Sequence, residues 1–172
     1  MNFLELARNR YSVRKFTDEP VSSEFIDKIL EAAQVAPTGC NLQPYRILVV
    51  QSNEAVEKLK KCTKCHFGAT AAMLVCCNKD ECWVRKYDGA QSGVIDASIV
   101  TTHMMLEATE LGLGTTWIMH FDPKAMREEF NIPSNLEPVA LLIMGHPAPD
   151  AQPLAMHSEF RPMDALVKYN SF

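Results

Sequence analysis

Four cationic side chains lie close together near the start of the chain, in the stretch RNRYSVRKF from Arg8 to Phe16. In an extended backbone, Arg10, Ser12 and Arg14 point to the same side. Two guanidinium groups flanking a hydroxyl could hold a phosphate or a carboxylate, because arginine donates hydrogen bonds in a rigid fork. The same charges could instead form a solvated edge or contact a nucleic acid.

A second stretch rich in hydrogen-bonding groups, PTGCNLQPY, runs from Pro37 to Tyr45 between an expected helix and an expected strand. Gly39 permits the close approach of a flat ligand, and the amides of Asn41 or Gln43 could bond to the edge of a heterocycle. The same composition is also typical of an ordinary turn. By itself, the stretch leaves the choice between a binding loop and a plain turn open.

The cysteine, histidine and glycine spacings complete no further known motif. Cys62 and Cys65 form a CxxC, but it follows a lysine-rich helix instead of a strand, and no second pair stands at zinc-site spacing. We therefore expect buried or incidental thiols, with a metal site or a redox pair as alternatives. The turn GLGTTW, from Gly112, follows a helix and opens a strand, which is the reverse of a dinucleotide-binding motif. The histidines do not pair at metal-ligand spacing, and no P-loop or hydrolase motif occurs.

The overall charge limits the partners. The 172 residues include 17 basic and 21 acidic side chains, for a formal net charge of -4, so broad nucleic-acid binding is not expected. No apolar run reaches membrane-spanning length, and the N-terminus lacks the apolar core of a signal peptide, so we expect a cytoplasmic protein. Its length and its 47% hydrophobic content predict one globular domain over residues 1–172.

The periodicity of the apolar residues predicts helices connected by strands. A polar loop with Trp83 and Tyr87 is expected over residues 79–93. Helices are expected over residues 3–9 and 94–111, from a Ser22 N-cap to Pro37, and after an Asp122 cap. A further short helix should begin at an Asn53 cap and carry the ion pairs Glu54–Lys58 and Glu57–Lys61. Strands are expected at YRILVVQ, AMLVCCN, TTWIM and PVALLIMG.

Two segments need a surface to pack against. The helix expected over 94–111 is apolar on most sides, which is typical of a central or interfacial helix. The tail from His146 onward is proline-rich and ends in the apolar residues Met163, Leu166 and Val167. Such a tail must dock either on its own core or on a partner subunit.

Four motifs, in this order, resemble those of the FMN-dependent nitroreductases. RYSVR resembles the RRSxR segment of that family, with Tyr11 in place of the second arginine. PTGCNLQPY resembles its PSxxNxQPW loop, and GLGTTWI resembles its helix-to-strand turn. FRPMDALVKYN resembles its basic C-terminal end. The similarity extends over essentially the whole chain.

The resemblance implies an α+β fold with a central, mainly antiparallel sheet surrounded by helices. It also implies an intertwined homodimer in which the C-terminal tail, residues 146–172, is exchanged and packs on the partner subunit. Two FMN sites would lie at the dimer interface. The chain is short for the family, so the loop over residues 79–93 is what remains to cover a substrate.

The resemblance also implies which residues bind FMN. Arg10 and Ser12, with Tyr11 between them, would serve the phosphate and the ribityl chain, and Arg14 would lie near the pyrimidine side of the ring. Arg161, from the tail, would join the phosphate. The other subunit would contribute Pro37, Thr38, Gly39 and Asn41. The turn near the edge of the isoalloxazine ring would contribute Thr115, Thr116 and Trp117.

The implied activity is hydride transfer from NADH or NADPH, through FMN, to a nitroaromatic, a quinone or a similar small-molecule acceptor by a ping-pong mechanism. Flavin performs the hydride transfer itself, so no catalytic side chain is assigned. One alternative is a non-catalytic flavin-binding or redox-sensing protein with Cys62 and Cys65 as its switch. Another is a different reductive reaction on the same scaffold, such as dehalogenation or flavin fragmentation.

Overall fold

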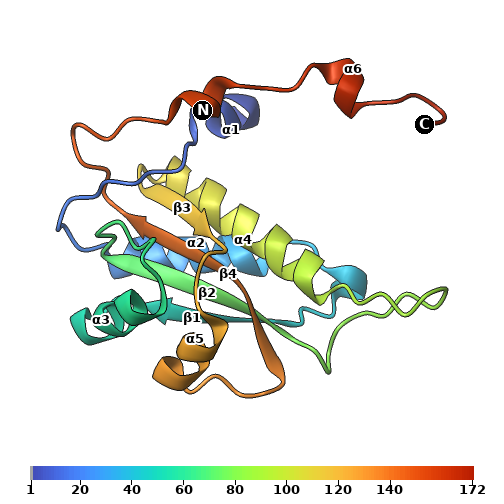
Figure 1. The fold of residues 1–172 in the computed structure, drawn as a ribbon, viewed down its shortest axis with the longest axis horizontal. Helices are drawn as coiled ribbons and strands as arrows, with labels where there is room; N and C mark the ends of the chain where they lie inside the picture. Colours follow the sequence, from blue (N-terminus) through green and yellow to red (C-terminus); the bar gives the residue numbers. More distant parts are fainter. Residues whose placement is uncertain (1) are drawn as a thin grey trace.

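Four antiparallel strands form a sheet with the order β1-β2-β4-β3 in the computed structural model, which describes residues 2–172 (Figure 1). The two central strands are long and apolar, and every residue of β2 is buried. Strand β3 lies at one edge. The strands are β1 (Tyr45–Val50), β2 (Ala71–Asn78), β3 (Gly114–Ile118) and β4 (Leu136–Gly145).

Helices cover both faces of this sheet (Figure 1). Helices α2 (Ser23–Gln34) and α4 (Gly93–Glu110) pack on one face, and α3 (Asn53–Cys62) and α5 (Pro123–Phe130) pack on the other. Alternate residues of β4 divide between two cores, because successive side chains of a strand point to opposite faces. Leu142 and Met144 face α2 and α4, whereas Leu141 and Ile143 face α3 and α5. The expected α+β architecture is confirmed.

Local capping signals set the ends of most helices. Ser22 Oγ accepts a hydrogen bond from Phe25 N at 3.2 Å, and Asp122 caps α5 through two backbone N–H groups. Gly112, with a φ of +81°, follows the end of α4 as predicted. The cap of α3 is Ser52 and not the expected Asn53, because Ser52 has the extended backbone from which its hydroxyl can accept a helical N–H.

The ion pairs of α3 agree only in part with the helical spacing. Lys58 pairs with Glu54 at 3.0 Å, as predicted. The expected Glu57–Lys61 pair is wrong, because Lys61 Nζ instead lies 3.0 Å from Glu129 Oε1 of α5. The packing of α5 beside α3 brings a carboxylate within reach from another part of the chain.

Helix α4 lies against the sheet and is the longest helix of the fold (Figure 1). Its buried side includes Ala97, Val100, Met104 and Ala108. Its first turn also carries exposed apolar side chains. No helix in the part of the chain from residue 2 onward is long and apolar enough to cross a membrane.

The N-terminal segment is held against the edge of β3. Helix α1 (Phe3–Asn9) leads into this segment. The backbone of the segment bonds to β3, because Val13 N donates a hydrogen bond to Thr115 O at 2.9 Å. The Thr116 hydroxyl donates in return to Val13 O. Gly114 permits this approach, because a Cβ there would lie 2.7 Å from Val13 Cγ2.

The C-terminal tail first follows the N-terminal segment and then leaves the body of the molecule (Figure 1). Thr17 N donates to His146 O at 2.9 Å, and Ala148 N donates to Lys15 O at 3.0 Å. Beyond these contacts the tail is largely extended, with two short helical turns, η2 (Ala155–Ser158) and α6 (Met163–Leu166). The predicted extended tail is confirmed, and its exchange between subunits stays a prediction.

The segment over residues 79–93 forms an arm that projects from the sheet near the start of α4 (Figure 1). Val84 and Gln91 form an isolated antiparallel bridge, and Ser92 N donates to Trp83 O at 2.9 Å. Tyr87, near its tip, is 98% exposed. The segment is therefore a hairpin-like arm with defined backbone pairing at its base.

Gly114→Ala is expected to lower the free energy of unfolding by about 1–3 kcal/mol, because the added methyl group overlaps the side chain of Val13. Urea denaturation measures this loss. Val13→Ala is the matched control, since it makes room for the new methyl group. The double variant should therefore lose less stability than the sum of the losses in the two single variants. Unchanged stability in Gly114→Ala would contradict the close packing of this segment on β3.

Candidate functional site

The predicted anion cradle lines a cavity of about 230 Å³. Arg10, Ser12 and Arg14 come together there, as the alternation of the segment predicted. Tyr11 also lines the cavity. The tail closes its other side with Leu154, Met156 and His157.

Within residues 2–172, the side-chain hydrogen bonds of the two cradle arginines go to neutral groups. Arg10 Nη1 lies 3.9 Å from Met105 Sδ of α4, and Arg14 Nη1 donates to Ser12 O at 3.0 Å. A thioether is a weak acceptor, and a backbone carbonyl carries no net charge. The positive charge of both guanidinium groups therefore remains available to an anion in the cavity.

Tyr11, at the position where the related motif has an arginine, connects the cradle to the tail. Its hydroxyl donates to Ala151 O at 3.3 Å. Its ring lies edge-on to His157, with ring centroids 6.2 Å apart and an interplanar angle of 63°. His157 Nε2 in turn lies 3.2 Å from Arg8 O. The substitution replaces a cation with an aromatic contact that holds the tail over the cavity.

The PTGCN loop is anchored on the first turn of α4 by a buried carboxylate. Asp96, which is 2% exposed, accepts a hydrogen bond from Gly39 N at 2.9 Å and another from Ser92 Oγ at 2.6 Å. A side chain at Gly39 would crowd the arm, because its Cβ would lie 3.1 Å from Trp83 Cβ. Asp96 belongs to none of the sequence motifs. An acidic residue in the first turn of a very apolar helix was the signal available.

The same loop has a left-handed backbone at three residues other than glycine. They are Cys40, Asn41 and Gln43, with φ values of 49°, 55° and 51°. Such conformations cost roughly 1 kcal/mol or more each, and they persist only where the surroundings hold them. Here Gln43 N donates to the Thr38 hydroxyl at 3.1 Å, and Gln43 Nε2 donates to Asn41 Oδ1 at 3.0 Å. The loop therefore has a defined, strained conformation, which an ordinary turn does not need.

The cradle and the loop are separated within one chain. Arg10 contacts Met105, in the second half of α4, whereas Gly39 is bonded to Asp96 in its first turn. At the helical rise of 1.5 Å per residue, Asp96 and Met105 are about 14 Å apart along the axis. Arg161 is exposed on the tail and does not line the cradle cavity. One chain thus does not gather all the residues assigned to one ligand.

The predicted residues at the start of β3 are mostly enclosed. Thr115 and Thr116 are 1% and 4% exposed, and Trp117 is half-buried. Thr115 pairs with Ser12 of the cradle in an isolated parallel bridge, and its own hydroxyl has no hydrogen-bond partner among the described residues. The side chains at this end of β3 therefore support the cradle from beneath.

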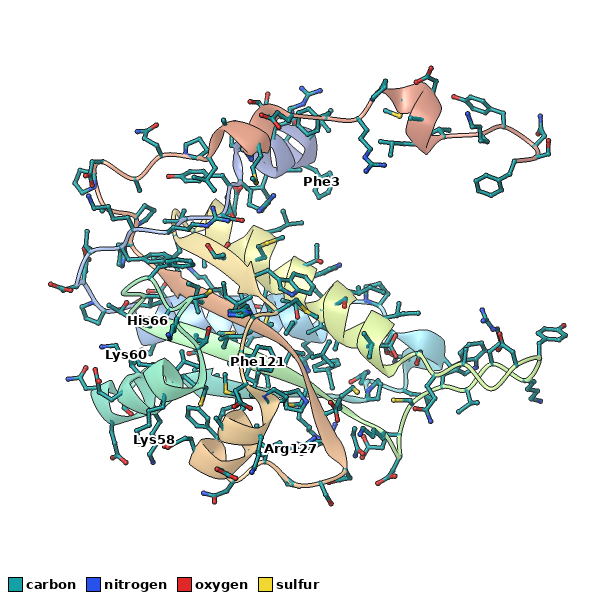
Figure 2. The ribbon with its side chains drawn as sticks, in the orientation of Figure 1. Phe3, Lys58, Lys60, His66, Phe121 and Arg127 are labelled. Carbon is teal, nitrogen blue, oxygen red and sulfur yellow. The ribbon has the colours of Figure 1, made fainter. Side chains whose placement is uncertain are left out.

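A second cavity of about 460 Å³ opens between the end of α3 and the connection from β3 to α5. Figure 2 shows Lys60 and Phe121, which belong to its two sides. Lys60 pairs with Glu57, whereas Lys64 and His120 are exposed. Its basic side chains are Lys60, Lys61, Lys64 and His120. This cationic lining has no sequence motif, because it comes from two segments that are distant in the sequence.

The two thiols of the CxxC differ in burial, since Cys62 is buried and Cys65 is half-buried. Cys62 is buried and its Sγ donates to Lys58 O at 3.4 Å. Burial raises the pKa of the Cys62 thiol, so little of it is present as thiolate near neutral pH. All six cysteines are free, as expected. In residues 2–172, no group of three or more side chains is arranged to hold a metal ion.

Comparison with known proteins decides the family. The profile of the Nitroreductase family matches residues 7–76 and 60–146. The chain belongs to the nitroreductase family. A putative NADH dehydrogenase/NAD(P)H nitroreductase of Methanothermobacter thermautotrophicus is 32% identical over 157 residues, which cover 86% of this chain and 78% of that protein. By this homology, the nitroreductase-family chain is an oxidoreductase.

Solved structures show that the fold is that of the same family. A nitroreductase family protein of Clostridium difficile 630 superposes with a TM-score of 0.94 at 44% identity, with 100% of both chains covered. An FMN-dependent nitroreductase of Clostridium difficile R20291 has a TM-score of 0.80 at 28% identity, covering 99% of this chain and 100% of its own. The central antiparallel sheet with helices on both faces is therefore a nitroreductase fold.

Proposed function

We propose that this nitroreductase-family chain is an FMN-dependent oxidoreductase. It takes hydride from NADH or NADPH and passes it, by a ping-pong mechanism, to a nitroaromatic, a quinone or a similar small acceptor. The observation that carries the proposal is the cradle of Arg10, Ser12 and Arg14. Its two guanidinium groups line a cavity and form no ion pair with a carboxylate of residues 2–172. A relative that is itself FMN-dependent supports the choice of flavin.

The chemistry of the cradle fits one terminal phosphate. Two guanidinium groups and one hydroxyl supply donors on a segment whose backbone is bonded to β3. Arginine and phosphate form bidentate contacts in which both partners are charged, and such contacts are about twice as strong as neutral hydrogen bonds. In this proposal Arg10 and Ser12 hold the phosphate and the ribityl chain. Tyr11 keeps the tail over them.

Arg14 has a different role, because of the two cradle arginines it is the one farther from the phosphate end. When bound, FMN accepts and delivers the hydride itself. Arg14 would place a fixed positive charge beside the pyrimidine side of the ring, where negative charge develops on reduction. No side chain needs to transfer a proton for this role.

The site is proposed to be shared between two chains of a homodimer. The cradle and the PTGCN loop lie toward different ends of α4, so a second copy is needed to bring them together. Apolar side chains suited to an interface are exposed at the start of α4 and on the tail, with exposed fractions of 58% for Val94, 63% for Ile95 and 85% for Phe160. A twofold axis would match each loop with the other chain's cradle. An exchanged tail would carry Arg161 toward the phosphate.

The purified protein is expected to be yellow, to release FMN on heating, and to oxidise NADH or NADPH when a nitroaromatic or a quinone is added. Chromatography of the released cofactor and steady-state absorbance at the nicotinamide band measure both properties. Arg10→Ala should reduce the FMN content, whereas Arg8→Ala, which removes a nearby charge outside the cavity, should not. Recovery of FAD, or of no flavin, contradicts the proposal. Flavin binding without turnover would favour the non-catalytic alternative.

Arg14→Ala is expected to lower the reduction potential of the bound flavin more than it lowers FMN affinity. The loss of a contact to a charged group should cost about 1.5–3 kcal/mol in the reduced state. Potentiometric titration measures the shift, and Arg10→Ala serves as the control that weakens binding instead. A loss of affinity with an unchanged potential would place Arg14 at the phosphate.

Mixing an Arg10→Ala chain with an Asn41→Ala chain is expected to restore flavin binding. Each variant homodimer has two defective sites, whereas the heterodimer has one site with an intact cradle and an intact loop. Unfolding and refolding the two variants together, followed by measurement of bound FMN, tests this. Neither variant refolded alone should regain flavin. A mixture that never regains flavin, or a monomer that retains it in light scattering, would exclude a shared site.

A further inference from the structure

Cys77 and Cys82 bring two thiols together where β2 ends. A turn at Asn78 folds the chain back, with Glu81 N donating to Asn78 O at 3.2 Å. Cys82 Sγ also donates to Asn78 O, at 3.1 Å. In this position the Cys82 thiol lies on the side of the turn that faces Gly93 and Cys77.

Gly93, the first residue of α4, leaves the space in which both sulfur atoms lie. A Cβ at this position would overlap Cys82 Sγ and would lie 3.1 Å from Cys77 Sγ. The two sulfur atoms are therefore neighbours around one small volume at the start of α4. Their proximity is set by three separate segments: the end of β2, the turn that follows it, and the first residue of α4.

The other cysteines are not arranged in this way. The thiol of Cys62 bonds to a backbone carbonyl of its own helix, and Cys65 follows it in a separate turn. Cys76 precedes Cys77 on the same strand, but it lies in the core on the opposite face of the sheet. The CxxC motif therefore does not identify the pair that the fold brings together.

We propose that Cys77 and Cys82 are a redox-active dithiol that hydrogen peroxide converts into a disulfide. The thiol of the half-buried Cys82 loses its proton, and the thiolate attacks one peroxide oxygen. The O–O bond breaks, a sulfenic acid forms, and the departing hydroxide takes up the released proton and leaves as water. The sulfur of Cys77 then attacks the Cys82 sulfur, the S–O bond breaks, and a second water leaves. The two thiols lose two protons and two electrons, and one peroxide becomes two waters.

The disulfide would lie at the base of the arm over residues 79–93, to which Cys82 belongs. Trp83, next to Cys82, packs close to Gly39 of the PTGCN loop. Oxidation would therefore add a covalent tie beside this loop. Any effect of that tie on flavin rests on the proposed function, but the formation of the disulfide does not.

The reaction should be slow at neutral pH and faster in alkaline solution. Burial raises the pKa of both thiols, so little thiolate is present near pH 7. The charged groups that act on the pair are Asp96 of α4 at Cys82, and Glu137 and Lys79 at Cys77. Below the thiol pKa, the oxidation rate should rise about tenfold per pH unit, as the thiolate fraction does.

Peptide mapping after peroxide treatment of the whole protein tests the proposal. Trypsin cleaves after Lys64, Lys79 and Arg85, so reduced protein yields peptides 65–79 and 80–85 as separate species. Oxidised protein should yield these two peptides joined, and dithiothreitol should separate them. Fragmentation between Cys76 and Cys77 should place the bond at Cys77.

Two variants complete the test. Cys82→Ser should abolish the joined peptides, whereas Cys65→Ser, which removes a half-buried thiol of the CxxC, should leave them unchanged. A bond from Cys82 to Cys65 or Cys76 in place of Cys77, or alkylation of both Cys77 and Cys82 after prolonged peroxide treatment at alkaline pH, would overturn the proposal. The mapping requires no flavin, so its failure is distinguishable from a failure of the proposed FMN function.

Discussion

The backbone pairing between Val13 and Thr115 is the interaction on which the candidate site depends. It attaches an extended cationic segment to the exposed edge of β3, where unpaired backbone groups are available. Without this attachment, Arg10 and Arg14 would be solvated side chains with no fixed relation to each other. Gly114 is the sequence feature that permits the pairing, because a side chain there would occupy the space that Val13 fills. The cradle is thus a property of the sheet edge as much as of its arginines.

Helix α4 organises the remainder of the site. Its second half contacts the cradle through Met105, and its first turn holds the PTGCN loop through Asp96. A buried carboxylate near a helix N-terminus is stabilised by the unpaired N–H groups there, and in this protein it also orders a strained loop. A rigid helix keeps these two groups apart within one chain. This fixed separation, together with the exposed apolar side chains at the start of α4, is the physical basis for a site assembled from two copies.

The cysteines illustrate how a motif and the tertiary structure can point to different residues. The CxxC spacing places Cys62 and Cys65 close in sequence, but one thiol is buried and bonded within its helix. Cys77 and Cys82 have no recognised spacing, yet a turn and a helix start bring their sulfur atoms together around the space at Gly93. The reactivity of a thiol depends on its neighbours in space. The spacing of two cysteines in the sequence predicts that they are neighbours only where both lie in the same helix, strand or turn.

The sequence alone determined the features that depend on neighbouring residues. The Ser22 and Asp122 caps, the Gly112 helix end and the alternation of the cradle segment were all predicted, because each depends on backbone and side-chain geometry within a few residues. The family motifs extended this to the α+β fold. The expected Asn53 cap was wrong because the adjacent Ser52 has a similar capping propensity. The backbone conformation decides between the two residues, and it favours Ser52.

Only the tertiary structure decided the contacts between distant segments. Lys61 pairs with Glu129 instead of its helical neighbour, and Asp96 holds a loop from a different part of the chain. The cationic cavity beside α3 likewise joins side chains from two separate segments. These contacts depend on how helices and strands pack against one another. Packing is set by the summed burial of many apolar side chains, and no local pattern of residue types specifies it.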